Sequence, residues 1–219
     1  MYHWVNDKAF IHAAYRISAD LVNQLIQRLK AYDIKARMNV VGSMKRNMVT
    51  QNEKEPIDFD FNLLVENARD FQPWDLKETI RKAFNEVLRK NDLKDCDDST
   101  SALTTKQIVL AKGRKIPFTI DVCIVSYDNY HKEIRRLIHN KTGLLAQDKY
   151  YWNDVPDSSE LWEKESFLKE NGYWNKVRET YLNKKKMYLT RNDHNHPSFV
   201  CYIEAVNEVY YKSKGYYRI

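Results

Sequence analysis

Glycine and proline are scarce in this sequence, with five residues of each among 219. This scarcity argues against loop-rich architectures and favours long regular helices and strands. No apolar run approaches the length of a membrane span, and the N-terminal segment "MYHWVNDKAF" has polar residues throughout, unlike a signal peptide. We therefore expect a cytoplasmic protein with no membrane partner.

Cysteine is also sparse. Cys96, Cys123 and Cys201 are far apart, odd in number and without CxxC spacing, which predicts free thiols in a reducing compartment and no structural zinc. The two histidines of "HNH" (194–196) have no matching cysteine or histidine partners, so this segment is expected to be a loop.

The residues that are present describe a globular protein. Hydrophobic residues make up 43% of the chain and charged residues 30%, and the length suits one large domain or two small, closely packed ones. A net charge of +6 and a pI near 9.0 suit an anionic partner such as a nucleotide or nucleic acid. The same modest basic excess can simply aid solubility.

Hydrophobic periodicity predicts mixed α/β structure followed by helices. In the first part of the chain we expect helical spacing over 8–32, with a second helix capped at Ser18 or Asp20, strands in 34–42 and 57–66, a helix over 75–90, and a hairpin over 106–126. Beyond residue 129 we expect helices near 130–140, 158–170, 173–189 and 198–212. The predicted fold class is α+β, a mixed sheet flanked by helices in 1–129, followed by a helical C-terminal half, 130–219.

The segment "IDFDFNLLV" carries two aspartates on one face of a strand. Alternation places Asp58, Asp60 and Asn62 on one side and the apolar residues of the strand on the other. Two neighbouring carboxylates repel each other unless a cation lies between or beside them. A half-solvated strand alternates in the same way, however, so this pattern alone leaves a surface strand open.

Asp121 makes the pattern more specific. It is the only charge in the apolar run "PFTIDVCIV", where an unpaired ion is costly. If the two strands are neighbours, three carboxylates meet, and they suit one or two Mg²⁺ ions that complete their shells with water and substrate phosphates. Upstream, Gly42-Ser43 forms a turn whose backbone amides and hydroxyl can hold phosphate oxygens.

Together these residues resemble the DNA polymerase beta-type nucleotidyltransferase superfamily, in which a Gly-Ser turn, an Asp-x-Asp strand and a third strand carboxylate occur in this order. The resemblance covers about residues 36–126 and identifies residues 1–129 as the catalytic domain. It implies that Asp58 and Asp60 bind two Mg²⁺ ions, with Mn²⁺ as an alternative. Asp121 would bind one ion and act as base, while Gly42 and Ser43 contact the triphosphate.

The C-terminal half (130–219) resembles the helical domain that closes the nucleotide cleft in this superfamily. The segment 196–211 is similar to a helix of the oligoadenylate and cyclic-oligonucleotide synthase branch, which implies nucleotide contacts for Ser198 and Tyr202. Lys185, in "NKKKMY" (183–188), is a candidate phosphate ligand. The alternatives are a helix cap for Ser198, a core position for Tyr202 and a solvated helix face for Lys185.

The implied reaction is transfer of a nucleoside monophosphate from an NTP, ATP or GTP, to a hydroxyl, with release of pyrophosphate. The acceptor remains open among a nucleotide, an RNA end, a protein and a small molecule, and a signalling oligonucleotide is one product. Two rivals are a non-catalytic nucleotide- or RNA-binding relative and a metal-dependent phosphohydrolase. The long charged spacer 44–56 is expected to determine which substrate is bound. The basic turn 111–117 is expected either to bind phosphate groups of the acceptor or to protect a sheet edge from pairing.

Overall fold

A computed structural model describes residues 1–111, 113, 116–128, 133–155, 159–191 and 198–215. The strands are β1 (Tyr2–Trp4), β2 (Ala36–Val40), β3 (Thr50–Asn52), β4 (Ile57–Val65), β5 (Asp97–Asp98), β6 (Leu103–Thr104), β7 (Phe118–Asp128), β8 (Glu133–Asn140) and β9 (Lys149–Asp154). The helices are α1 (Lys8–Leu29), α2 (Gly42–Lys45), α3 (Pro73–Lys90), α4 (Ser159–Glu170), α5 (Trp174–Thr190) and α6 (Ser198–Ser213). This is the predicted α+β fold class.

The central sheet is mixed. Its strand order is β2-β4-β7-β6-β5, and the β8–β9 hairpin joins through β7, whereas β1 and β3 form a separate two-stranded sheet. Strands β4 and β7 run parallel, and the other pairs are antiparallel. The two long strands in the middle therefore lie side by side, as the carboxylate pattern required.

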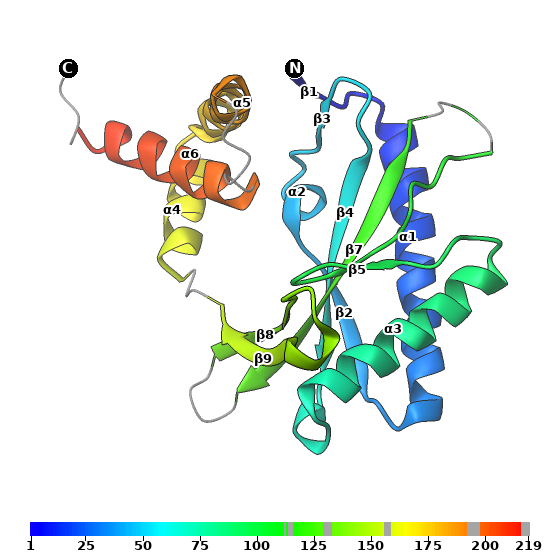
Figure 1. The fold of residues 1–219 in the computed structure, drawn as a ribbon. Coiled ribbons are helices and arrows are strands. Elements are labelled where there is room, and N and C mark those ends of the chain that lie inside the picture. Colours follow the sequence, from blue (N-terminus) through cyan, green and yellow to red (C-terminus); the bar gives the residue numbers. More distant parts are fainter. Residues whose placement is uncertain (112, 114–115, 129–132, 156–158, 192–197, 216–219) are drawn as a thin grey trace.

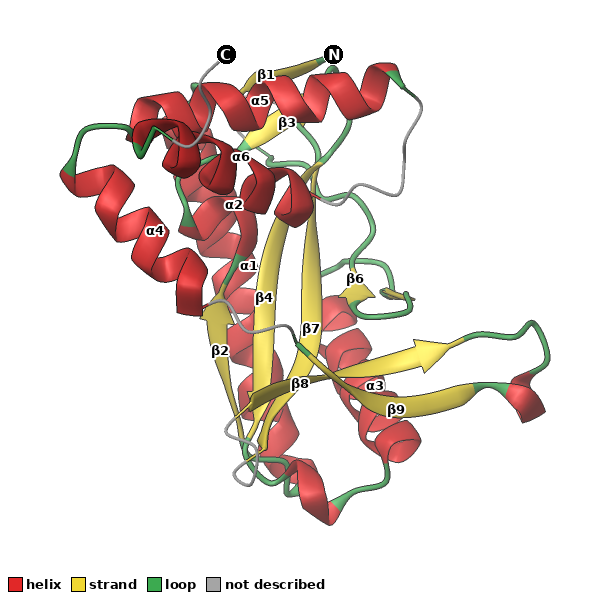
Figure 2. Ribbon diagram, turned by 90° about the vertical axis from the view of Figure 1, so that its left-hand side faces the viewer, coloured by secondary structure: helices red, strands yellow, loops and turns green. Residues whose placement is uncertain are grey.

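One face of the sheet is covered by α1 and α3 (Figure 1). The apolar side chains of β4 and β7 point into this core, and Phe59 and Phe61 are fully buried. Asp58 is exposed and Asp60 is half-buried on the opposite face. That face is seen in Figure 2 between α5 and α6 at one end and the β8–β9 hairpin further along.

Two expected elements differ from the structure. Residues 8–29 form one continuous helix, because the Ser18 hydroxyl donates to the Ala14 carbonyl within the helix (2.9 Å) instead of capping a second one. Residues 106–111 pair with β7 only through the isolated Ile108–Phe118 bridge, so the expected hairpin is reduced to one bridge in the described residues.

The helix expected near 130–140 is wrong: residues 133–140 form β8, whose backbone pairs with β7 and β9. The strand buries Leu137 in the sheet core, and tertiary pairing overrides the helical appearance of its charged residues. The helices expected near 158–170, 173–189 and 198–212 are confirmed as α4, α5 and α6. None of the helices that the structure describes is long and apolar enough to cross a membrane.

The spacer 44–56 connects the sheet to the C-terminal helices. Met48 is buried in the helical core formed by α4, α5 and α6, and the Arg178 side chain donates to the Asn47 carbonyl (2.5 Å). Strand β3 within the spacer pairs with β1, and Trp4 of β1 contacts Tyr181 of α5 at 6.1 Å between ring centroids. The spacer therefore has a structural role, because its contacts pack the C-terminal helices against the sheet.

Candidate active site

The strand register brings the three predicted carboxylates together. In the parallel β4–β7 pair, Asp60 lies opposite Asp121, and Asp58 lies opposite Thr119. Because side chains two residues apart share a strand face, all three aspartates project from the same side of the sheet. The Thr119 hydroxyl donates to the Asp58 carboxylate at 2.6 Å, which fixes the orientation of that side chain.

The electrostatics of this face differ from those of a surface strand. Burial, with the charges of Asp121 and Asp58, raises the pKa of Asp60 to about 7, although Arg46 and Arg136 oppose this rise. Burial also raises the pKa of Asp121, partly offset by a hydrogen bond from Thr104. Asp60 and Asp121 are thus too buried, with too little positive charge nearby, to ionise in the ordinary range.

Position 42 requires glycine, because of both its backbone conformation and the atoms that surround it. Its φ is +65°, and a Cβ at this position would lie 2.0 Å from an Asp60 carboxylate oxygen. The amide of Val41 donates to the Asp60 carbonyl (2.9 Å), so the turn lies directly against the carboxylate strand. Ser43 follows in α2, where its carbonyl accepts a hydrogen bond from the Met48 amide (2.9 Å). The Gly-Ser turn and Asp60 are therefore one structural unit.

Lys185 reaches this unit from α5. Its ammonium donates to the Thr50 hydroxyl (2.9 Å) and lies 4.0 Å from the centroid of the Tyr2 ring. Burial lowers the pKa of Lys185 to about 8, against the opposing charges of Cys201, Asp58 and Asp60. The side chain is consequently a half-buried cation close to the aspartates, unlike a lysine on a solvated helix face.

The other two C-terminal candidates lie differently. Ser198 is exposed at the first turn of α6, and its side chain bonds to Tyr181, which packs beside Tyr202. Tyr202 is 2% exposed, and the Arg46 guanidinium covers its ring at 4.2 Å from the centroid. Its ring has no free face for a base, so the structure places it in the core of the C-terminal helices, as the alternative interpretation had it.

The residues present fit a hard divalent cation. Among the described residues, no group of three or more His, Cys, Asp or Glu side chains is arranged ready to hold a metal ion. Mg²⁺ does not need such a cage, because it usually takes one or two carboxylates and completes its shell with water and phosphates. One buried Asp121 oxygen has no hydrogen-bond partner, and Asp60 is short of positive charge. A cation at this face would supply what both groups lack.

Several residues at this site had escaped sequence reasoning. Thr119 and Thr104 hold the carboxylates, and Arg46 lies within electrostatic reach of Asp60 and donates to the Gly42 carbonyl (3.0 Å). Thr119 shares a strand face with Asp121, which was the available signal. Lys112, Arg114 and Lys115 of the basic turn and the HNH segment (194–196) lie outside the described residues.

No protein-family model matches the sequence, and a search of curated proteins finds no match. Solved structures do match. The CdnE cyclic dinucleotide synthase of Elizabethkingia meningoseptica, in complex with GTP and Apcpp, superposes with a TM-score of 0.52 at 12% identity, over 86% of this chain and 68% of that chain. The chain therefore shares the fold of this cyclic dinucleotide synthase.

A second solved structure agrees. Vibrio cholerae DncV in its 3'-deoxy ATP bound form gives a TM-score of 0.50 at 12% identity, over 78% of this chain and 44% of that chain. The chain thus spans about two thirds of CdnE and less than half of DncV. At this identity the likeness establishes the fold, and it confirms the predicted fold class and the fold that the resemblance implied.

Proposed function

We propose that this chain transfers a nucleoside monophosphate from an NTP to a hydroxyl acceptor and releases pyrophosphate. The single observation that carries this proposal is the parallel register that sets Asp60 beside Asp121, with Asp58 on the same face. The fold shared with a cyclic dinucleotide synthase and the half-buried Lys185 near these carboxylates support it. The likeness to a cyclic dinucleotide synthase favours a second nucleotide as acceptor and a signalling oligonucleotide as product.

Each residue has a stated part in this reaction. Asp58 and Asp60 would hold two Mg²⁺ ions, or Mn²⁺, and Asp121 would hold one of them. Such ions stabilise the charge that develops on the transferred phosphate and the leaving pyrophosphate. Asp121 would also accept the proton of the acceptor hydroxyl, whose oxygen bonds to the α-phosphorus as the α–β phosphoanhydride bond breaks.

The nucleotide side of the site lies next to the Gly-Ser turn. Gly42 and Ser43 would approach the triphosphate closely, because glycine leaves no side chain between the turn and Asp60. Lys185 would neutralise phosphate charge, and Ser198 would contact the nucleotide from the first turn of α6. The division into a catalytic part, 1–129, and a C-terminal part, 130–219, stays a proposal, with β8 and β9 extending the sheet across it.

The test is product analysis with NTPs labelled at the α-phosphate, in the presence of Mg²⁺ or Mn²⁺. The wild type should release pyrophosphate and form a nucleotidylated product, and Asp58→Ala/Asp60→Ala should lower this rate at least about 100-fold. Asp20→Ala is the matched control, because Asp20 is an exposed aspartate on α1, which covers the opposite face of the sheet, and its loss should leave the rate unchanged.

Other outcomes would identify the rivals. Pyrophosphate without a nucleotidylated product would indicate a phosphohydrolase. Metal-dependent NTP binding without pyrophosphate release, across ATP and GTP with varied acceptors, would indicate a non-catalytic binding relative. Either result would contradict the proposed transfer.

A further inference from the structure

The short helix that begins at Gly42 ends in an arginine with contacts in two directions. Arg46 is the C-cap of the four-residue helix α2, and its side chain donates a hydrogen bond back to the Gly42 carbonyl (3.0 Å). On its other side, the guanidinium lies 4.2 Å from the centroid of the Tyr202 ring and 5.2 Å from that of Phe199. Both rings belong to α6, which lies beside α2 (Figures 1 and 2). One side chain therefore joins the Gly-Ser turn to the C-terminal helices.

The turn depends on such a contact for its shape. The φ of +65° at Gly42 is only one of several conformations that a glycine adopts easily. Helix α2 is a single turn, too short to be stable by itself. The backbone amide of Arg46 bonds to the Met44 carbonyl, which leaves the Gly42 carbonyl to the Arg46 side chain. The guanidinium thus helps to fix the conformation of the turn.

The Tyr202 ring gives this guanidinium a fixed support. Tyr202 lies in the core of the C-terminal helices, where the rings of Trp174 and Tyr181 pack against it edge-on. A ring held on several sides in a close-packed core moves only with the helix that carries it. A planar guanidinium can stack on this ring and still donate in its own plane, which a lysine ammonium cannot do. The position of α6 is thereby transmitted to the Gly42 carbonyl.

A second arginine makes the same kinds of contact at a different place. Arg178 of α5 stacks on Trp4 of β1, 4.4 Å from the ring centroid, and donates to the Asn47 carbonyl (2.5 Å). Like Arg46, it is half-buried and joins the C-terminal helices to the segment between β2 and β3. Its carbonyl partner lies beyond α2, however, and outside the Gly-Ser turn. Of these two arginines, only Arg46 contacts the turn itself.

We propose that Arg46 is a positioning residue that couples the packing of α6 to the conformation of the Gly-Ser turn, and through the turn to binding of the nucleotide triphosphate. This inference rests on the nucleotide site of the proposed function. Arg46 holds the turn in the shape that receives phosphate while its guanidinium stacks on Tyr202. Such coupling is reciprocal, so a nucleotide bound at the turn also holds α6 in place.

The test is calorimetric titration of Apcpp, with Mg²⁺, into the full chain and its variants. Arg46→Met should weaken Apcpp binding at least tenfold, because it removes both the donor and the stacking plane. Arg46→Lys should stay at least fivefold weaker than the wild type, because an ammonium restores the charge without the planar fork of donors. Arg178→Met is the matched control: it removes the same two kinds of contact elsewhere, and its affinity should stay within twofold of the wild type.

A double-mutant cycle separates this coupling from direct contact between Arg46 and the nucleotide. Tyr202→Leu removes the supporting ring and should weaken Apcpp binding at least fivefold, whereas Tyr202→Phe keeps the ring and should stay within twofold of the wild type. The double variant Arg46→Met/Tyr202→Leu should lose no more than Arg46→Met alone, because both changes break one contact. Phe199→Leu repeats the cycle at an exposed ring, without disturbing the core, and should weaken binding at least twofold.

Three results would overturn the inference. Apcpp affinity within twofold of the wild type in Arg46→Met would show that the turn does not depend on this side chain. Full recovery in Arg46→Lys, or additive losses in the cycle, would show that Arg46 acts on the nucleotide directly. Equal losses in Arg46→Met and Arg178→Met would show that only the general packing of the helices matters. Failure of the proposed function is read separately: Apcpp binding that depends on Arg46 as predicted, without pyrophosphate release from ATP or GTP, would contradict the transfer and support this inference.

Discussion

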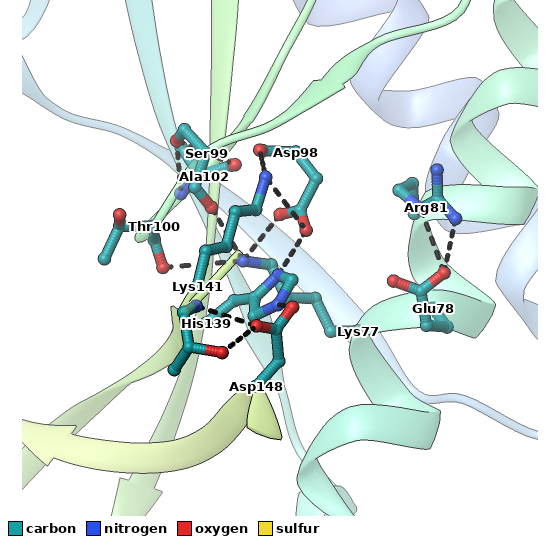
Figure 3. A network of polar contacts seen from close by, with 11 residues as sticks. Lys77, Glu78, Arg81, Asp98, Ser99, Thr100, Ala102, His139, Lys141 and Asp148 are labelled. Carbon is teal, nitrogen blue, oxygen red and sulfur yellow. Dashed lines mark hydrogen bonds and ion pairs between the residues drawn. The ribbon is translucent and has the colours of Figure 1, made fainter. Parts of the chain in front are cut away.

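Two groups of charged side chains on this sheet differ in how their charges are matched. On the face of β4 and β7, Asp58, Asp60 and Asp121 lie together, and one buried oxygen of Asp121 has no partner. Around β8 one oxygen of Asp98 also accepts no hydrogen bond, but the Lys77 ammonium forms an ion pair with it at 2.8 Å and His139 contacts the other oxygen. The second group, which we call the His139 cluster (Lys77, Asp98, His139, Lys141 and Asp148), is shown in Figure 3.

This difference distinguishes charges that stabilise the fold from charges that are available to bind a ligand. In the His139 cluster both imidazole nitrogens contact carboxylates, and Asp98 also lies beside the ammonium groups of Lys77 and Lys141. The carboxylate face has like charges and too few cations, which costs stability in the absence of a ligand. Proteins retain such an arrangement at functional sites, where binding supplies the missing charge.

The two groups also predict opposite responses to pH. Burial raises the pKa of Asp98, but Lys77 and His139 outweigh it and keep the pKa below its usual range. A lowered carboxyl pKa contributes stability at neutral pH that is lost as pH falls below about 4. The pKa of Asp60 is raised to about 7, so its contribution is present below about pH 4 and is lost as pH rises to 7.

The largest loss of stability is expected from Lys77→Met in the His139 cluster. Lys77 is 1% exposed, and its removal leaves Asp98 with one cation fewer in a buried setting. The free energy of unfolding should fall by about 3–5 kcal/mol, measured by urea denaturation at pH 7. Lys106→Met is the control: Lys106 pairs with the neighbouring Asp97, both are half exposed, and the loss should stay below about 1 kcal/mol. Equal losses in the two variants would contradict the claim that the buried charges of the His139 cluster stabilise the fold.

The opposite sign is expected for Asp60→Asn in metal-free protein. The substitution removes a carboxylate that is costly to ionise, so the variant should be more stable than the wild type by about 2–3 kcal/mol at pH 8. The advantage should become small near pH 4, where Asp60 is protonated in the folded state and about half protonated in the unfolded state. Urea denaturation from pH 4 to 8 in the presence of EDTA measures this, and a variant less stable at every pH would contradict it.

A smaller effect is expected at the Gly-Ser turn. Gly42→Ala forces a Cβ against Asp60 at a positive φ and should cost about 2 kcal/mol, together with loss of nucleotidyl transfer. Gly172 also has a positive φ, 76°, but no atom lies within 4 Å of its added Cβ. Gly172→Ala should therefore cost about 1 kcal/mol and preserve activity. Thermal unfolding and the product assay compare the two variants. Similar losses of activity would contradict the claim that the Gly-Ser turn belongs to the active site.

The carboxylate face was predictable because its signals are local. Alternation along residues 57–65 placed Asp58 and Asp60 on one face, and Asp121 was conspicuous as the only charge in an apolar run. The register between the strands confirmed that Asp60 and Asp121 are neighbours. A pattern within each strand, added to a recognisable Gly-Ser turn, was enough to find this face.

The His139 cluster could not be found in the same way. Lys77, Asp98 and His139 come from a helix, a two-residue strand and a longer strand, and nothing in the local sequence pairs them. Adjacent Arg135 and Arg136 also interrupt alternation in β8, so this strand was expected to be a helix and Arg136 was missed. The periodicity of a sequence does not predict contacts between distant segments, because these contacts depend on tertiary packing.

The most direct test of the account is thermal unfolding of the wild type and Asp60→Asn at pH 8, in EDTA and then in Mg²⁺ with Apcpp. In EDTA the variant should have the higher Tm. Metal and nucleotide should reverse the order, because a ligand that binds only the folded state stabilises the protein that retains the carboxylate. No shift of the wild-type Tm, or an equal shift in both proteins, would contradict a metal–nucleotide site on Asp58, Asp60 and Asp121.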